Sequence, residues 1–446
     1  MQWFPLLFAL LLPCSFTLSY KEKWGYVPVR PKANLFWWHY YTDDTERPLV
    51  LWLQGGPGAS GVGFGNFEEI GPVDWHNRTR EHSWLEKADL LFIDNPVGTG
   101  FSFTTDPNGY TKNIDEICDD LLAFFKFWGP RHVSATNKPF YIFSESYGGK
   151  MTAAFGDLLY KKIQSGEVKM NFKGVALGDS WISPADYVNS WGEYLYAFSF
   201  MGDNDLVIYN RQAEKCQKLV DQNRWSEATD CWGSAENVVE SLTKDVSFYN
   251  VMDVSGIKQA NSAKFGSVRG TSLYFYGKPK SSHVNLNGLL GRRKSLAKAR
   301  QSGSLEEFMN NEVRQKLRII PESVRWTESS FEVFQNQQGD FMKPVIHNVD
   351  SLLTHEDIKV VVFNGQLDLI CDVMGTEKWM SKLQWPHLTD FAKRDREAFF
   401  TEGGQFAGYS KRLKNLEFYS VFKAGHMVPL DNAEGGMKML EMILNA

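Results

Sequence analysis

The sequence has little charge imbalance, few cysteines and no long apolar run beyond its first twenty residues. Lys and Arg total 48 against 53 Asp and Glu, which gives a formal net charge of −5. This balance argues against a nucleic-acid partner, which would need a basic surface. After the N-terminus no run approaches the 18 apolar residues of a membrane span. We therefore expect no nucleic acid and, for the mature chain, no membrane as a partner.

The sequence also lacks the motifs of metal and nucleotide chemistry. No H-E-x-x-H motif occurs, and none of the nine histidines is followed by Glu three residues later. A zinc peptidase is therefore not expected. Neither a P-loop nor a dinucleotide fingerprint is present. We predict no metal and no cofactor.

The N-terminus, MQWFPLLFALLLPCSFTLS, is apolar and uncharged. It predicts a secretory signal peptide over residues 1–19, with a signal anchor as the alternative. The sequon at Asn77 predicts a glycosylated surface loop of a secreted protein. Together these features indicate a secreted or lysosomal protein.

Only five cysteines occur, and Cys14 is removed with the signal peptide. Cys216 and Cys231 are close enough in sequence to close a short loop, and export would permit a disulfide there. We expect this bridge, with two free thiols as the alternative. Cys118 and Cys371 are expected to be free, buried thiols.

Short apolar runs rich in β-branched and aromatic residues predict the strands of an α/β domain. The runs are 36–41, 49–54, 89–95, 140–146, 174–180, 360–366 and 416–425. Several are apolar almost throughout, as in strands that are buried on both faces. Helical spacing over 115–128 and 150–165 predicts helices between them. We expect one domain over residues 20–446 with a mostly parallel central sheet and helices on both faces.

The middle of the chain, about 181–310, lacks strand runs and predicts a largely helical insertion in this domain. The basic stretch GRRKSLAKAR falls in a Gly-, Ser-, Lys- and Arg-rich segment over 277–300. It predicts a solvated loop or helix face, with a protease-processing loop as the alternative. No internal repeat or low-complexity tract is evident.

The stretch YIFSESYGGK places Ser146 where a predicted strand turns into a helix. This resembles the G-x-S-x-G turn that exposes a nucleophilic serine, although Ser144 replaces the first glycine. Glycine at that position can be a backbone requirement, so Ser144 would be strained if its φ were positive. The alternative is that Ser146 is an ordinary turn serine.

A nucleophilic serine needs a base and an acid that orients the base. Asp368 in FNGQLDLIC and His426 in FKAGHMVPLD each follow a predicted strand. Both should therefore lie at the carboxyl edge of the sheet, where open α/β sheets build their sites. The order Ser, Asp, His is that of α/β-hydrolases. These three residues are the candidate catalytic triad of an α/β-hydrolase fold.

The glycine-rich loop WLQGGPGAS follows an early strand, in the position of a loop that supplies an oxyanion-hole amide. A plain Gly-Pro turn is the alternative. We predict that the backbone N–H groups of Gly56 and Tyr147 form the oxyanion hole.

Six stretches together resemble the serine carboxypeptidases: WLQGGPGAS, NFEEIGP, DNPVGTGFS, SESYGGK, NGQLDLI and AGHMVP. The resemblance extends over nearly the whole mature chain. It implies hydrolysis of peptides or proteins at their C-termini through an acyl-enzyme on Ser146. It further implies that the substrate carboxylate is held by a group of residues comprising Trp52, Gln54, Gly55, Glu69 and Glu145.

Carboxylates that lie close to a carboxylate substrate must share protons, because like charges raise the pKa of one member of the group. Such a site should bind its substrate best at acidic pH.

Three residues in the predicted active-site stretches differ from those that are usual in the serine carboxypeptidases. Gln54 replaces an asparagine, Gln366 replaces an acid, and Ala59 replaces a cysteine that would anchor a disulfide. They keep two alternatives open: an esterase or amidase that acts on non-peptide substrates, and a secreted binding protein with little turnover. The sequence does not define the side-chain preference, and a homodimer stays open.

Overall fold

The computed structural model describes residues 19–253 and 303–445. The basic segment 277–300 and residues 1–18 of the predicted signal peptide lie outside the described residues. Among the described residues, no helix combines the length and apolar character needed to traverse a bilayer.

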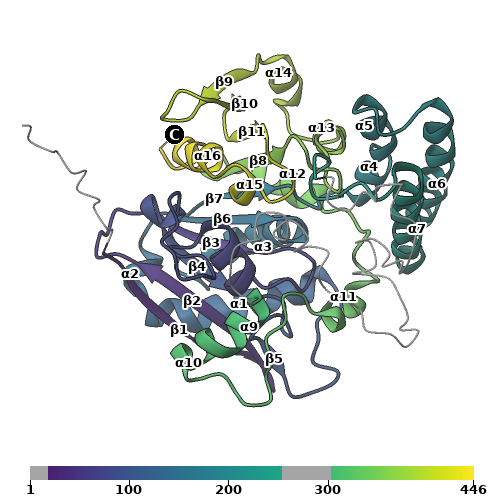
Figure 1. Cartoon of the computed structure of the whole chain (residues 1–446). Coiled ribbons are helices and arrows are strands. Elements are labelled where there is room, and N and C mark those ends of the chain that lie inside the picture. Colours follow the sequence, from purple (N-terminus) through teal and green to yellow (C-terminus); the bar gives the residue numbers. More distant parts are fainter. Residues whose placement is uncertain (1–18, 254–302, 446) are drawn as a thin grey trace, which may run out of the picture.

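The described residues form a single 11-stranded sheet at the centre of the molecule (Figure 1). Its strand order is β1-β2-β4-β3-β6-β7-β8-β11-β10-β9, and the short β5 pairs with β2. The strands are β1 (Lys21–Arg30), β2 (Ala33–Tyr41), β3 (Leu49–Leu53), β4 (Asp89–Ile93), β5 (Phe103–Thr104), β6 (Phe140–Glu145), β7 (Phe172–Gly178), β8 (Lys359–Gly365), β9 (Glu397–Phe400), β10 (Phe406–Leu413) and β11 (Leu416–Val421).

The central run β4-β3-β6-β7-β8-β11 is parallel throughout. The pairs at both ends, β1–β2–β4 and β11–β10–β9, are antiparallel. The predicted α/β-hydrolase fold class, with its mostly parallel sheet, is thus confirmed. All seven apolar runs form strands, whereas the runs do not include the more polar edge strands β1 and β9 or the neighbouring β10.

Helices cover both faces of the sheet, and side chains of the central strands alternate between two apolar clusters. In β6, Phe140 and Ile142 pack in one cluster, while Tyr141 and Phe143 pack in the other. This period of two is what a strand buried on both faces requires. The helices α1 and α3 pack on the first face, and η1 and α16 pack on the second.

The helices fall into groups along the chain. Before the insertion lie the π-helix η1 (Gly61–Ile70), η2 (Trp84–Glu86), α1 (Ile114–Trp128), η3 (Gly129–Arg131), α2 (Val133–Thr136) and α3 (Tyr147–Gln164). Between β7 and β8 lie α4 (Pro184–Val188), α5 (Trp191–Ala197), α6 (Asp203–Asp221), α7 (Trp225–Thr243), α9 (Leu305–Phe308), η5 (Met309–Val313), α10 (Arg314–Leu317), α11 (Phe331–Gln337) and α12 (Ile346–Leu353). After β8 lie α13 (Val373–Met380), α14 (Leu388–Lys393), α15 (Val428–Asp431) and α16 (Ala433–Leu444).

The helical part between β7 and β8 is longer than predicted. Helices continue from α4 to α12, beyond the predicted end near residue 310, and the sheet resumes at Lys359, where the run 360–366 predicts a strand. The reason is that α9 to α12 are short, so their apolar spacing gives a weak periodic signal. The antiparallel helices α6 and α7 project beyond the sheet, at the right of Figure 1. The predicted disulfide Cys216–Cys231 joins them, with 5.4 Å between the Cα atoms.

Candidate active site

Ser146 lies in a strained turn between β6 and α3. Its backbone has φ +62° and ψ −130°, a region that non-glycine residues rarely adopt. Its N–H donates to the carbonyl oxygens of Gly178 (3.0 Å) and Asp179 (3.1 Å), and its own carbonyl accepts from Gly149 and Trp181. These bonds hold the serine above the carboxyl edge of the sheet, as the strand-to-helix turn predicts.

Small residues around Ser146 are required by close backbone contacts. A Cβ atom on Gly148 would lie 2.1 Å from the carbonyl oxygen of Leu53, and one on Gly55 would lie 2.4 Å from the Cβ of Ser146. The position of Ser144 carries no such restriction, because its φ is not positive and its hydroxyl donates to the carbonyl of Ala176 at 3.1 Å. The strain that a glycine-specific backbone would cause at Ser144 is therefore absent.

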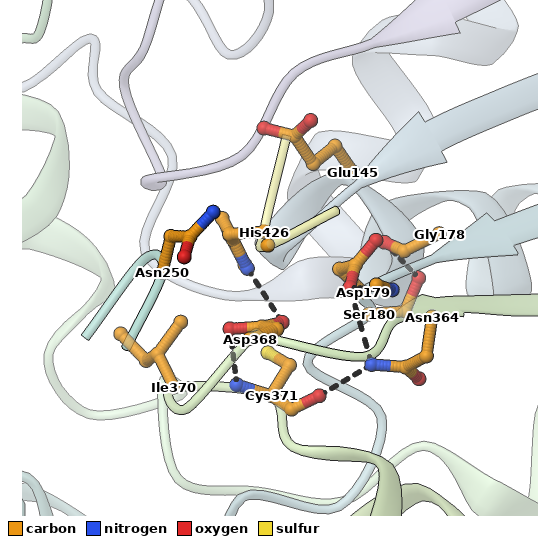
Figure 2. A network of polar contacts seen from close by, with 12 residues as sticks. Glu145, Gly178, Asp179, Ser180, Asn250, Asn364, Asp368, Ile370, Cys371 and His426 are labelled. Atoms are coloured by element: carbon orange, nitrogen blue, oxygen red, sulfur yellow. Dashed lines mark hydrogen bonds and ion pairs between the residues drawn. The ribbon is translucent and has the colours of Figure 1, made fainter. Parts of the chain in front are cut away.

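Asp368 and His426 form the buried pair that the sequence predicts. His426 Nδ1 donates to Asp368 Oδ2 at 2.9 Å, and both side chains are almost inaccessible to solvent (Figure 2). The backbone N–H of His426 donates to the carbonyl of Tyr249, and the two rings pack edge to face with centroids 5.3 Å apart. This arrangement fixes the imidazole with Nδ1 toward the acid, which leaves Nε2 for proton transfer.

Ser146 and His426 line the same pocket, which has an empty volume of about 700 Å³ that includes open solvent. The Ser146 side chain makes no capping hydrogen bond to α3, so its hydroxyl is not held by the start of that helix. In free enzymes the hydrogen bond between a nucleophilic serine and its base is often long and tightens when substrate binds. The structure thus brings the three predicted triad residues to one edge of the sheet, with the Asp–His half already hydrogen-bonded.

The amides predicted for the oxyanion hole border this pocket. Gly56 has φ +109°, and its loop packs against the Ser146 turn through Gly55. Tyr147 begins α3, where the first N–H groups of a helix lack intrahelical acceptors. Among the described residues, neither N–H donates to an acceptor. Both amides are therefore free to receive a developing negative charge.

The residues implied to bind a carboxylate form a buried chain of hydrogen bonds. Trp52 Nε1 donates to Gln54 Oε1 at 2.6 Å, and Gln54 Nε2 donates to Glu145 Oε1 at 2.8 Å. Gln54, Gly55 and Glu145 line the pocket, whereas Trp52 and Glu69 lie behind them. Trp52 therefore supports the site by fixing the Gln54 amide rather than by lining the pocket.

Glu69 and Glu145 are a coupled pair of buried carboxyl groups. Burial raises the pKa of Glu69 to about 7, and in the described part of the chain neither of its carboxyl oxygens has a hydrogen-bond partner. Burial raises the pKa of Glu145 well above its usual range, and the neighbouring charge of Glu69 raises it further. Glu145 accordingly keeps a proton that it can donate to an anionic ligand.

The loop after β3 is held without the disulfide that Ala59 rules out. Ser60 N–H donates to the carbonyl of Glu328 at 3.0 Å, and Ser330 N–H donates to the carbonyl of Gly58 at 2.9 Å. Ala59 and Ser329 form an isolated antiparallel bridge. Backbone pairing therefore anchors this loop to the segment before α11.

Aromatic side chains that the sequence analysis did not single out form one wall of the pocket. Trp181, Trp232 and Phe341 all line it, and Phe341 contacts both tryptophans with ring centroids 4.8–5.1 Å apart. Phe341 also stacks on Tyr147 at 5.9 Å. Trp232 comes from α7, so the helical insertion contributes directly to the pocket. The only sequence signal for this wall was the aromatic content of the insertion.

The chemistry of the groups around the triad does not favour a metal ion. In the described part of the chain, Asp368, Cys371 and His426 place their ligand atoms within 4.8 Å of one another. Burial and the charge of Asp368 raise the pKa of Cys371 well above its usual range, so its sulfur stays protonated. Asp368 and His426 are already bonded to each other.

Three other predictions concern the glycosylation of Asn77 and the free thiols of Cys118 and Cys371. Asn77 is exposed and has φ +58°, and its side chain donates to Glu312 at 2.9 Å. Its glycosylation stays a prediction. Cys118 and Cys371 are buried free thiols, as predicted.

Comparisons with known proteins agree with this geometry. The serine carboxypeptidase family profile matches residues 13–446. The retinoid-inducible serine carboxypeptidase of Mus musculus is 44% identical over 430 residues, which cover 95% of this chain and 91% of that protein. Serine carboxypeptidase-like 51 of Arabidopsis thaliana is 40% identical over 429 residues, 94% of this chain and 91% of that protein.

A crystal structure of a prohormone-processing carboxypeptidase from Saccharomyces cerevisiae has the same fold. Its TM-score is 0.76 at 22% identity, with 95% of this chain and 91% of that chain covered. Because the family match extends over nearly the whole sequence and is supported by relatives of 40% identity and more, the chain belongs to the serine carboxypeptidase family.

Proposed function

We propose that this serine carboxypeptidase removes the last residue of a peptide through an acyl-enzyme on Ser146. The observation that carries the proposal is a single pocket that Ser146 and His426 share with the buried group of Gln54, Gly55 and Glu145. A nucleophile beside a carboxylate-binding group fits a substrate whose cleaved bond lies one residue from its C-terminus.

The triad residues divide the chemistry as follows. His426 Nε2 takes the Ser146 proton as Oγ bonds to the carbonyl carbon, and Asp368 stabilises the imidazolium through Nδ1. The resulting oxyanion is held by the amides of Gly56 and Tyr147. When the intermediate collapses, the C–N bond breaks and the imidazolium gives its proton to the leaving amine, which departs as a free amino acid.

Water then completes the reaction. It attacks the acyl carbon while His426 takes its proton, and collapse of the second intermediate returns a proton to Ser146 Oγ. The shortened peptide leaves with a new C-terminal carboxylate.

The Glu145 proton explains how a carboxylate can bind beside two glutamates. A protonated Glu145 donates to the substrate carboxylate, and the Gly55 amide and the Gln54 side chain are the other groups at this end of the pocket. Such a site works best when the pair of Glu69 and Glu145 carries no net charge, which is the acidic condition. An acidic compartment, lysosomal or extracellular, fits this requirement, the predicted signal peptide and the disulfide.

The test is the release of free amino acids from a synthetic peptide at pH 5 and from the same peptide with an amidated C-terminus. We expect release from the first only, because the amide removes the charge that Glu145 recognises. Ser146→Ala should reduce release by at least about 10³-fold. The matched control Ser144→Ala, two residues earlier and outside the pocket, should retain most activity.

A fluorophosphonate probe separates the alternatives. Labelling of Ser146 without peptide cleavage would favour an esterase or amidase, and absence of labelling would favour a binding protein. Cleavage of the amidated peptide at an equal rate would reject the carboxylate-binding role.

A further inference from the structure

Asp179 joins the nucleophile turn to the strand that precedes Asp368. It is the first residue after β7, is completely buried and has φ +41°. Its N–H donates to the carbonyl of Phe363 in β8 at 2.8 Å, and its carbonyl accepts from the N–H of Ser146. A non-glycine residue with positive φ at this junction is a strained position of the kind found at functional sites.

The side chain of Asp179 has only half of its hydrogen-bonding capacity filled. Its Oδ1 accepts from the N–H of Gly365 at 2.8 Å and from Asn364 Nδ2 at 3.1 Å. In the described part of the chain, its Oδ2 is buried without a donor. A buried carboxylate oxygen that lacks a donor is costly, and a proton on that oxygen would remove the cost.

Asn364 cannot turn to supply the missing donor. Its Nδ2 also donates to the carbonyl of Cys371 at 2.6 Å, and its Oδ1 accepts from Thr376 at 2.7 Å. These bonds tie Asp179 to the loop 366–371 that carries Asp368, and Figure 2 shows the continuous network. The amide group is therefore fixed at both ends.

The neighbour of Asp179 is Asp368 itself. The two buried carboxyl groups interact electrostatically. Asp368 already uses Oδ2 for His426 and receives only a long bond of 3.3 Å from the Cys371 N–H at Oδ1. Two buried carboxyl groups that act on each other in this way disfavour each other's charged form, so one of them keeps a proton. The proton belongs on the group whose oxygen lacks a donor.

The electrostatic surroundings favour the same assignment. Burial raises the pKa of Asp179 well above its usual range, and the charge of Asp368 raises it further, followed by that of Asp431. Other titratable groups that interact with Asp179 are Glu145, Cys371 and Tyr194. The pKa values of all three are raised, so these groups stay neutral.

We propose that Asp179 is a positioning residue: it carries a proton, donates a hydrogen bond to Asp368 and thereby holds Asp368 in line with His426. The proposal rests on the proposed function, in which Asp368 and His426 act together. A neutral Asp179 leaves the Asp–His pair with one negative charge, which is the charge that balances the imidazolium formed when His426 takes the Ser146 proton.

The experiment compares Asp179→Asn and Asp179→Leu in the full-length enzyme, with the matched control Glu236→Gln, which removes a buried carboxyl from α7 outside the triad network. Asparagine keeps an acceptor for Gly365 and offers a permanent N–H donor to Asp368. We expect kcat within about threefold of wild type for Asp179→Asn, and a loss of about 10- to 100-fold in kcat with little change in KM for Asp179→Leu.

The pH profile of kcat/KM separates a neutral from an ionised Asp179. If the residue is neutral, Asp179→Asn removes no charge and the acidic limb, which reports the pKa of the catalytic base, stays in place. If it is ionised, losing the negative charge lowers that pKa and shifts the limb to lower pH. A downward shift of about one unit, or equal damage in both variants, would overturn the proposal.

The Asp179→Leu and His426→Ala variants give two further outcomes that bear on the proposal. If Asp179→Leu fails to fold, the pH profile of Asp179→Asn alone decides, and if it folds with full activity the positioning role is rejected. His426→Ala provides the separate test of the proposed function. If His426→Ala retains full activity, the triad assignment fails regardless of the Asp179 variants.

Discussion

Glu69 and Glu145 belong to the proposed carboxylate-binding group, in which Glu145 lines the pocket and Glu69 does not. Under that proposal, the ionisation of Glu69 sets the charge that a substrate carboxylate meets. Burial raises the pKa of Glu69 to about 7, and burial together with the charge of Glu69 raises the pKa of Glu145 well above its usual range. Below pH 7 the pair is therefore mostly neutral. As the pH rises through 7, Glu69 loses its proton and a negative charge appears beside the substrate carboxylate.

This sequence of ionisation predicts that KM for a peptide with a free C-terminus rises about tenfold between pH 6 and pH 8 in the wild type. In Glu69→Gln the rise should be largely lost, because glutamine cannot ionise, whereas Glu236→Gln should behave as the wild type. Initial rates over a range of peptide concentrations at each pH measure the effect. A wild-type KM that stays constant over this interval would contradict the role of the pair.

Individual site residues differ in how far the sequence could predict them. Ser146, Asp368 and His426 follow strand-like runs, so their meeting at one sheet edge follows from topology. Glu69 and Glu145 were predicted as carboxylate-binding residues only because the sequence resembles the family. Asp179 was missed because an aspartate after a strand is ordinary turn chemistry. Its contact with Asp368 depends on β7 and β8 being neighbours, which no local pattern reveals.

At the scale of elements, the helical insertion supplies one wall of the active-site pocket. Helix α7 is joined to α6 by the Cys216–Cys231 disulfide and presents Trp232 to the pocket. Trp232 is almost fully buried and contacts Phe341 and Trp181. Because this aromatic group adjoins Tyr147, whose amide is proposed for the oxyanion hole, it is placed to receive a bulky apolar side chain next to the cleaved bond.

Trp232→Ala should therefore reduce kcat/KM selectively. For peptides with Phe or Leu in the penultimate position we expect kcat/KM to fall by about 10- to 100-fold, because the substrate side chain can no longer bury apolar surface against the indole ring. Peptides with penultimate Gly should change by less than about threefold, since they make little contact with this wall. A peptide series that varies only this residue measures the effect.

The control for this variant is Trp225→Ala, on the same helix but outside the pocket lining. It should leave the preference unchanged. An equal loss for every peptide in Trp232→Ala would point to a general disturbance of the fold instead of a subsite.

The sequence predicts the central strands better than the strands near the sheet edges and the short helices, for a physical reason. Central strands are buried on both faces and read as continuous apolar runs, so all seven were found. Strands at and next to the sheet edges, such as β1 and β10, are partly exposed and carry charged side chains, so they lack the continuous apolar runs that predict a strand. The short helices between α9 and α12 are defined by packing against other elements rather than by their own periodicity.

At the scale of the whole molecule, carboxyl groups with raised pKa values are buried at several separate places in the core. Burial raises the pKa values of Asp94, Glu328 and Asp372 to about 7. Asp94 accepts from the Ser60 hydroxyl and from two backbone amides, while Asp372 accepts from the Ser190 hydroxyl and from a backbone amide of α13. With Glu69 these groups make the folded state bind more protons than the unfolded chain between pH 4.5 and 7.

The sign of the resulting stability change follows from proton linkage. A carboxyl group whose pKa is raised in the folded state stabilises that state fully below its unfolded pKa, near 4, and the contribution is lost as the pH rises through about 7. We therefore expect Tm to fall by about 5 °C or more from pH 5 to pH 8. Differential scanning calorimetry at intervals of half a pH unit measures this decline. Asp94→Asn and Glu328→Gln combined should reduce its slope, because amides do not titrate, and a Tm that rises over the same interval would show that the buried carboxyls are ionised in the folded protein.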